Sequence, residues 1–140
     1  VLSEHGKSRV AYMPADLDRR YAREHLPDHG NLLANVVRWV AGENVPLSVV
    51  GPGFIDCHLY RQQNRLILHL VNLTSAATWR APLDELIPVG PLKVRVRLPA
   101  EVTGKTARLL VSGGEKRVTA DRGYGVIEVS SVTDHEVLVI

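Results

Sequence analysis

Two histidines, His25 and His29, have the i, i+4 spacing with which a helix presents two ligands to a metal ion. Pro27 lies between them, and a helix interior does not tolerate proline, because its ring removes a hydrogen bond and clashes with the preceding turn. The sequence places no third ligand near the pair. We therefore predict no metal site, and no motif in the sequence indicates a cofactor.

Asp16 and Asp18 could serve as acid and base, since a pair of carboxyl groups cleaves glycosidic bonds. Acidic residues at the start of a helix more commonly accept hydrogen bonds from its first free amides and interact with the positive end of its dipole. An enzymatic hypothesis would need Asp16, Asp18, His25 or His29 to converge in one cleft, for which the sequence gives no reason. We predict no catalytic residue in this chain.

The single cysteine, Cys57, is followed by His58 and, farther along, by His69, so a nucleophile with its base has to be considered. Adjacent strand residues point to opposite faces, and Cys57 shares its face with Ile55 and Leu59. Burial in apolar surroundings makes a thiol unreactive, so we interpret Cys57 as a core residue. A single cysteine also excludes an internal disulfide and a disulfide-dense extracellular scaffold.

Three aromatic residues, Trp79, Tyr60 and Tyr124, could stack on a sugar ring, as aromatic side chains of carbohydrate-binding sandwiches do. Aromatic residues make up only 5% of the chain, so no platform is obvious, and Trp79 could instead anchor a loop to the sheet. This hypothesis predicts at least two rings that are coplanar and exposed on one surface. The glycosylation pattern at Asn72 is discounted, because such a short motif arises often by chance.

Composition limits the classes of protein that the chain can be. A length of 140 residues with 45% hydrophobic content allows one ordinary domain with a core. Lys and Arg total 17 against 15 Asp and Glu, and they are scattered singly, so the formal charge of +2 gives no electrostatic case for nucleic acid. No apolar run is long enough for a membrane span, and the sequence shows no charged-then-apolar leader that would suggest a signal peptide. We expect a soluble, cytoplasmic protein, and the start at Val1 fits a piece of a longer polypeptide.

The element that should position these residues is a β-hairpin. Residues 54–60 alternate between apolar and polar, residues 66–73 are apolar on both faces, and the polar spacer 61–65 closes the pair. A strand that is apolar on both faces is typical of the centre of a layered β core. Further strands are expected at 92–98, 106–111, 116–120, 124–129 and 135–140. Together they predict an antiparallel β-sandwich of about seven strands.

The first part of the chain has a different pattern. It predicts a strand at 8–13, a helix at 17–24, and a second helix at 32–41 with one continuous apolar stripe. This order is typical of the end of an α/β layer, but the partner strands that would bury it are not evident. We predict a mainly β protein with two domains, 1–46 and 47–140. The first would be the β-α remnant of an α/β domain, which the family resemblance that follows implies to be flavodoxin-like, and the second the sandwich.

Two stretches resemble a known family. The segments RVAYMPAD (9–16), PDH (27–29) and NLLANVVRW (31–39) resemble the closing strand and helix of the glutamine-amidotransferase-like domain of β-galactosidase-type glycoside hydrolases. In the family-42 enzymes that domain is known as the trimerisation domain. The continuation through HLVNLT (69–74) and the sandwich strands is similar to the small C-terminal β domain of those proteins and of related hypothetical glycoside hydrolases.

The resemblance implies a role without catalysis. Family members carry their paired catalytic glutamates in an N-terminal TIM barrel that this chain does not contain, and their amidotransferase-like domain serves assembly. The chain would then be the non-catalytic C-terminal fragment of a glycoside hydrolase in carbohydrate metabolism, serving packing and oligomer assembly. Its partners would be the remainder of the parent hydrolase or another copy of the chain in a homo-oligomer. The alternative is an accessory carbohydrate-binding sandwich module.

Overall fold

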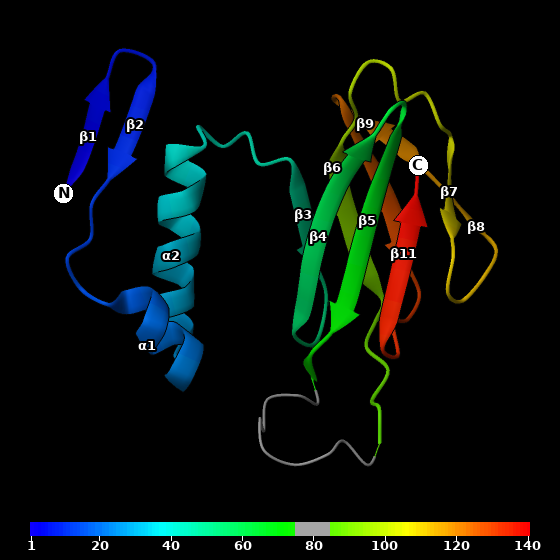
Figure 1. The fold of residues 1–140 in the computed structure, drawn as a ribbon, viewed down its shortest axis with the longest axis horizontal. Coiled ribbons are helices and arrows are strands. Elements are labelled where there is room, and N and C mark those ends of the chain that lie inside the picture. The colour runs from blue at the N-terminus through cyan, green and yellow to red at the C-terminus, as the bar shows by residue number, and fades with distance from the viewer. Residues whose placement is uncertain (75–84) are drawn as a thin grey trace. The chain divides into compact units, whose positions relative to one another are not determined.

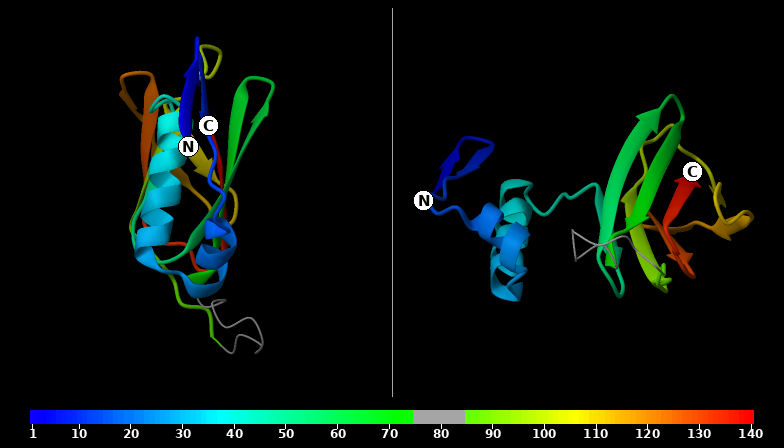
Figure 2. Two further views of the ribbon diagram at one scale, coloured as in Figure 1. Left: turned by 90° about the vertical axis from the view of Figure 1, so that its left-hand side faces the viewer. Right: turned by 60° about the horizontal axis from the view of Figure 1, so that its bottom comes forward.

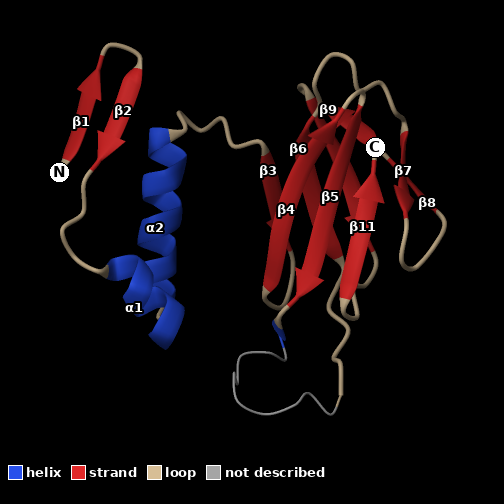
Figure 3. Cartoon of the chain, in the orientation of Figure 1, coloured by secondary structure: helices blue, strands red, loops and turns tan. Residues whose placement is uncertain are grey.

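In the computed structural model of the chain, residues 1–74 and 85–140 are described. The chain divides into two compact units, Val1–Val45 and Pro46–Ile140, which we call the N-terminal unit and the sandwich unit. Both are shown in Figure 1, and Figure 3 colours them by secondary structure. Within the described part of the chain, neither of the two helices has the length and apolarity that crossing a lipid bilayer requires.

The N-terminal unit is a hairpin followed by two helices. Its elements are β1 (Leu2–His5), β2 (Ser8–Ala11), α1 (Leu17–Glu24) and α2 (Pro27–Val40). The strand expected at 8–13 is β2, and it pairs antiparallel with β1 across a turn at Gly6, whose positive φ of 60° suits glycine. Arg9 links the hairpin to α2, because its Nη1 donates to the carbonyl of Trp39 at 2.9 Å. The first strand therefore has a partner within the chain.

Burial in the N-terminal unit is incomplete. None of residues 1–45 is buried, although α2 carries the predicted apolar stripe. Val37 is 60% exposed, and Val40, three residues later on the same helix, is 41% exposed. A two-stranded sheet with two short helices offers too little surface to cover an apolar face of this size.

The sandwich unit contains nine strands among its described residues, and all the pairings between them are antiparallel. Its elements are β3 (Leu47–Val50), β4 (Ile55–Gln62), β5 (Arg65–Asn72), β6 (Leu92–Arg97), β7 (Thr106–Leu109), β8 (Glu115–Arg117), β9 (Thr119–Asp121), β10 (Tyr124–Val129) and β11 (His135–Val139). One sheet has the order β3-β6-β10-β9 and the other the order β4-β5-β11-β7-β8. At one end the β4–β5 and β9–β10 hairpins diverge (Figure 2), as twisted sheets do when they pack face to face.

The core lies between the two sheets. Along β5 and β6 every second side chain points inward, and these inward side chains are almost fully shielded from solvent. The largest fully shielded apolar side chains are Leu68, Leu70, Leu92, Val94, Val96, Ile127, Val129 and Leu138. Burying a side chain of this size contributes about 1.5–3 kcal/mol, so this layer is the main source of the unit's stability. The predicted mainly β fold with an antiparallel sandwich is confirmed.

The sandwich has more strands than the seven expected. Residues 47–50, where the sequence predicts no strand, form the edge strand β3. The strand expected at 116–120 is two strands in different sheets, because the chain crosses from one sheet to the other at buried Val118. The crossing needs glycine at position 125, where a Cβ would lie 2.7 Å from a methyl group of Val118. Alternation alone cannot reveal such a crossing.

The buried carboxylate of Glu136 accepts backbone hydrogen bonds where the pairing between β7 and β11 ends. Glu136 of β11 is 2% exposed, and its oxygens accept hydrogen bonds from the backbone amides of Val111, Ser112 and Val137 at 2.9–3.0 Å. β7 ends at Leu109, so the amides of Val111 and Ser112 lie beyond the part of the chain that pairs with β11. Burial by itself would raise the pKa of the Glu136 carboxyl, but these hydrogen bonds, together with one from the Ser112 hydroxyl, outweigh burial and lower that pKa.

We expect Glu136→Gln to destabilise the sandwich unit by roughly 1–3 kcal/mol near neutral pH, because an amide group replaces an oxygen that accepts a backbone hydrogen bond. The native pKa is lowered, so the carboxylate stabilises the fold above its unfolded-state pKa, and this contribution is lost as pH falls through the native pKa. Urea denaturation followed by circular dichroism should therefore show a large difference near neutrality and a small one in acid. Exposed Glu115→Gln is the control, and equal losses for both variants would contradict this role.

Candidate functional surfaces on the two sheets

The predicted sugar-stacking residues do not meet. Tyr60 lies on the outer face of β4 in the five-stranded sheet, and Tyr124 lies on the outer face of β10 in the four-stranded sheet. The outer faces of a sandwich point in opposite directions, so these two rings cannot form one coplanar platform. Trp79 lies outside the described residues.

Tyr60 belongs to a group of rings that sequence reasoning missed. The hairpin closes with a two-residue turn at Gln63 and Asn64, which places His58 directly opposite His69. His135 of β11 lies one strand farther along the sheet. We call His58, Tyr60, His69 and His135 the ring surface. A two-residue turn assumed in place of the five-residue spacer would have predicted the His58–His69 pairing.

Ring contacts and hydrogen bonds hold the ring surface together. His69 Nδ1 and His135 Nε2 are 3.1 Å apart, so one ring nitrogen donates a hydrogen bond and the other accepts it. His58 Nε2 lies 3.0 Å from a carboxylate oxygen of Asp56. The ring of Tyr60 stands edge-on to His69, with ring centres 5.7 Å apart, and nearly parallel to His58 at 6.5 Å. The surface therefore presents an exposed phenol ring with hydrogen-bonding groups around it.

Metal binding gains no support from this arrangement. Over residues 1–74 and 85–140, no three His, Cys, Asp or Glu side chains are grouped as a metal ion would need. On the ring surface, His69 and His135 direct ring nitrogens at each other, and His58 directs one at Asp56. The chemistry this surface offers is stacking and hydrogen bonding.

Tyr124 is enclosed by two arginines of β6. The guanidinium carbon of Arg95 lies 3.5 Å from the centre of the Tyr124 ring, and that of Arg97 lies 5.3 Å from it. Arg97 also donates to the Tyr124 hydroxyl at 3.0 Å, and Arg95 is 3.6 Å from a carboxylate oxygen of Asp121. Cation–π contacts of this kind are favourable, and the face of the ring under Arg95 is closed to a sugar.

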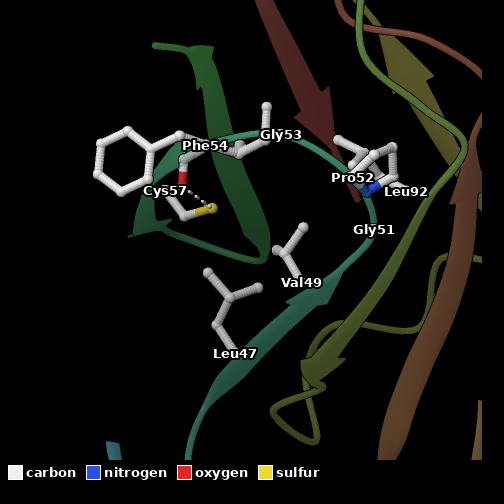
Figure 4. A pocket seen from close by; sticks show the side chains of 9 residues that line it. Leu47, Val49, Gly51, Pro52, Gly53, Phe54, Cys57 and Leu92 are labelled. Atoms are coloured by element: carbon white, nitrogen blue, oxygen red, sulfur yellow. Dashed lines mark hydrogen bonds between the residues drawn. The ribbon is translucent and has the colours of Figure 1, made fainter. Parts of the chain in front are cut away.

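Cys57 lines an apolar cleft between the edge strands of the two sheets. The cleft has a volume of about 290 Å³, and Leu47, Val49 and Cys57 point toward it (Figure 4). The thiol lies 3.7 Å from the carbonyl oxygen of Ile55. Burial, and secondarily the negative charge of Asp56, raise the pKa of the Cys57 thiol. Because the adjacent His58 is on the opposite face of β4, the structure offers Cys57 no base there.

The acidic residues and histidines of the N-terminal unit occupy separate positions. Asp16 and Asp18 lie at the start of α1, whereas His25 follows its last residue, about 12 Å away at 1.5 Å per residue. Asp16 makes no side-chain cap hydrogen bond, contrary to our expectation, and instead pairs with Arg19 at 3.5 Å. His29 is in the first turn of α2, with its Nδ1 buried and without a hydrogen-bond partner.

Asn72 is a structural residue. Its amide nitrogen donates to the carbonyls of Ile87, Val132 and Thr133 at 2.8–3.2 Å, and its oxygen accepts from the amide of Thr74. The side chain is 8% exposed, so the fold itself occupies the nitrogen to which a glycan would be attached. This supports discounting the glycosylation pattern.

The fold resembles parts of two larger enzymes. One is alpha-L-fucosidase isoenzyme 2 from Paenibacillus thiaminolyticus, with a TM-score of 0.73 and 19% identity, covering 99% of this chain and 21% of that one. The other is a cycloisomaltooligosaccharide glucanotransferase from Paenibacillus sp., solved with cycloisomaltoheptaose, with a TM-score of 0.51 and 12% identity, covering 68% of this chain and 16% of that one.

At these identities the similarity shows the fold alone. Both neighbours are carbohydrate-active enzymes related to glycoside hydrolases, which agrees with the broad class of the resemblance seen in the sequence. This chain spans about a fifth of the length of the fucosidase. No protein-family model matches the sequence, and no curated protein matches it significantly.

We expect the Cys57 thiol to react with a disulfide reagent more slowly in the native chain than in the urea-unfolded chain, because its pKa is raised. Asp56→Asn should speed the native reaction near neutral pH, because removing the nearby negative charge lowers that pKa. Asp28→Asn in the N-terminal unit is the control and should change nothing. A native rate equal to the unfolded rate would show that the thiol is not shielded.

Proposed function

We propose that this chain is a non-catalytic, C-terminal part of a glycoside hydrolase of the β-galactosidase type. In this proposal the N-terminal unit completes an amidotransferase-like α/β domain, and the sandwich unit packs against the remainder of the parent enzyme. Another copy of the chain is the second partner, as in the trimerisation domain of the family-42 enzymes.

The observation that carries the proposal is the missing core of the N-terminal unit. Its helices and hairpin form, yet none of residues 1–45 is buried. Val37 and Val40 of α2 and Val10 of β2 are among the apolar side chains left exposed. An apolar face of this kind marks a surface that another protein segment covers. The strands absent from the α/β layer, or a neighbouring copy, would supply the cover.

The structural comparisons support the part of the proposal that makes this chain a segment of a larger carbohydrate-active enzyme. Almost the whole chain, both units included, matches a segment that makes up 21% of an alpha-L-fucosidase. A segment that makes up about a fifth of an enzyme has a size that suits an accessory, non-catalytic domain. The resemblance of RVAYMPAD and NLLANVVRW to the amidotransferase-like domain is the basis for naming the β-galactosidase type.

The chain should associate through α2. Replacing Val37 and Val40 together by Lys should shift a concentration-dependent assembly of the full chain toward monomer, because two ammonium groups would have to be buried in the contact. Light scattering coupled to size exclusion measures the shift. Val111→Lys in the sandwich unit is the matched control, because Val111 is as exposed as Val37, at 60%.

A chain that is monomeric at all concentrations and binds no copy of itself would restrict the partner to the rest of the parent enzyme.

The non-catalytic part of the proposal has its own test. Incubation of the full chain with a panel of nitrophenyl glycosides should release no nitrophenol above background, and measurable turnover that survives repurification would refute it.

Carbohydrate binding is a second candidate function, and the exposure of Tyr60 favours it. The phenol ring is 56% exposed, with His58 and His69 beside it as hydrogen-bonding groups. Sugar rings stack on exposed aromatic faces while their hydroxyls bond to neighbouring polar groups. Tyr124 is less suited, because Arg95 occupies one face of its ring.

If the ring surface binds a neutral glycan, Tyr60→Ala should weaken binding of a fucosylated or an isomalto-oligosaccharide by about tenfold, the effect of losing one stacking contact. Tyr12→Ala is the matched control, because Tyr12 is similarly exposed, at 63%, in the N-terminal unit. Chemical-shift perturbation of the full chain measures both affinities. Equal losses in the two variants would remove the ring surface as the site.

A further inference from the structure

The outer side of the four-stranded sheet gathers positive charge that is dispersed along the sequence. Alternation along β6 places Lys93, Arg95 and Arg97 on this face. β8, in contact with β10, adds Lys116 and Arg117. Against these five cations stand three carboxylates, Asp121 of β9, Glu128 of β10 and Glu115, which shares a face of β8 with Arg117. The face therefore has a local excess of two positive charges, as large as the formal charge of the whole chain.

Part of this face is hollowed into what we call the basic groove. It has a volume of about 400 Å³ and is lined by Lys93, Lys116, Arg117, Thr119, Val126, Glu128 and Ser130. Lys116 Nζ donates to the Ser130 hydroxyl at 2.9 Å. Among the described residues, Lys93 and Arg117 have neither a carboxylate within ion-pair distance nor a side-chain hydrogen bond. Two cations in the groove are therefore available to an anion.

The groove also contains groups that a simple anion site does not need. The Thr119 and Ser130 hydroxyls donate and accept hydrogen bonds, and the Glu128 carboxylate accepts them. A ligand that satisfies this set carries a negative group for the cations and hydroxyls for the other three. We propose that the basic groove binds an acidic saccharide, with a uronate carboxylate on Lys93 and Arg117 and sugar hydroxyls on Glu128 and its neighbours.

A nucleic acid fits this groove less well. A nucleic acid carries a phosphate at every nucleotide, so its backbone would also have to pass the carboxylates of Glu128 within the groove and of Asp121 beside it. Proteins that hold single strands also need aromatic faces on which bases stack. The aromatic ring on this sheet face is Tyr124, and Arg95 covers it at 3.5 Å. The mixture of cations, a carboxylate and hydroxyls therefore favours a saccharide.

This proposal rests on the carbohydrate-binding function and gives it a ligand class and a second site. The basic groove and the ring surface lie on different sheets, so their ligands can be separated by mutation. Binding of a neutral glycan that depends on Tyr60 would support the ring surface as a binding site and would leave the proposal for the groove unaffected. Binding of an acidic glycan that depends on Lys93 and Arg117 would uphold the groove.

The test compares an oligogalacturonate with its methyl ester, which has the same sugar framework without the negative charge. Titration calorimetry on the full chain should show binding of the acid and no binding of the ester. Replacing Lys93 and Arg117 by Gln should weaken binding of the acid roughly tenfold or more, because two charge-assisted hydrogen bonds are lost at an exposed site. Arg65→Gln, an exposed cation at the start of β5, is the control and should have no effect.

Three results would overturn the proposal. The first is no binding of the acid. The second is equal affinity for the acid and its ester, which would show that charge recognition is absent even if carbohydrate binding is real. The third is equal affinity for a single-stranded DNA of the same charge, which would show that the groove recognises negative charge alone. Thermal melting of each variant confirms that the fold is intact, which is expected because both substituted side chains are exposed.

Discussion

The structure of this chain depends on the burial of apolar side chains between two facing sheets. Leu68 and Leu138 in one sheet, and Val94 and Val96 in the other, are fully shielded from solvent. Their alternation with outward residues leaves each strand no freedom of register, because a slip by one residue would turn the whole apolar set outward. Everything on the outer faces, including the ring surface and the basic groove, is placed by this inner layer.

Fixed register makes the two outer faces chemically different. The inward residues of β4 and β6 are apolar, whereas their outward residues are imidazole, phenol and carboxyl groups on β4 and cations on β6. Residues far apart in sequence meet because their strands are neighbours, as His69 and His135 do. The sandwich unit can in this way carry two distinct polar surfaces, each supported by the same core.

Alternation in the sequence was enough to predict the sandwich. It could not predict which strands become neighbours, because pairing is decided by packing of the whole domain. A five-residue turn at 61–65 leaves the pairing of His58 with His69 undefined, whereas the observed two-residue turn fixes it. For this reason the sequence interpretation did not reveal the ring surface. The crossing at Val118 was missed because a strand that changes sheets keeps its local extended pattern.

The N-terminal unit shows what the same forces produce without a second layer. Its two strands pair with each other and its two helices form, and Arg9 links β2 to α2 through the Trp39 carbonyl. Hydrogen bonds contribute little net stability in water, however, and most of the stabilisation of a fold comes from apolar area removed from solvent. With none of residues 1–45 buried, the hydrophobic contribution to this unit is small. In the function proposed here, the segment that covers Val37 and Val40 would supply most of the stability of this unit, and its folding and its association would be coupled.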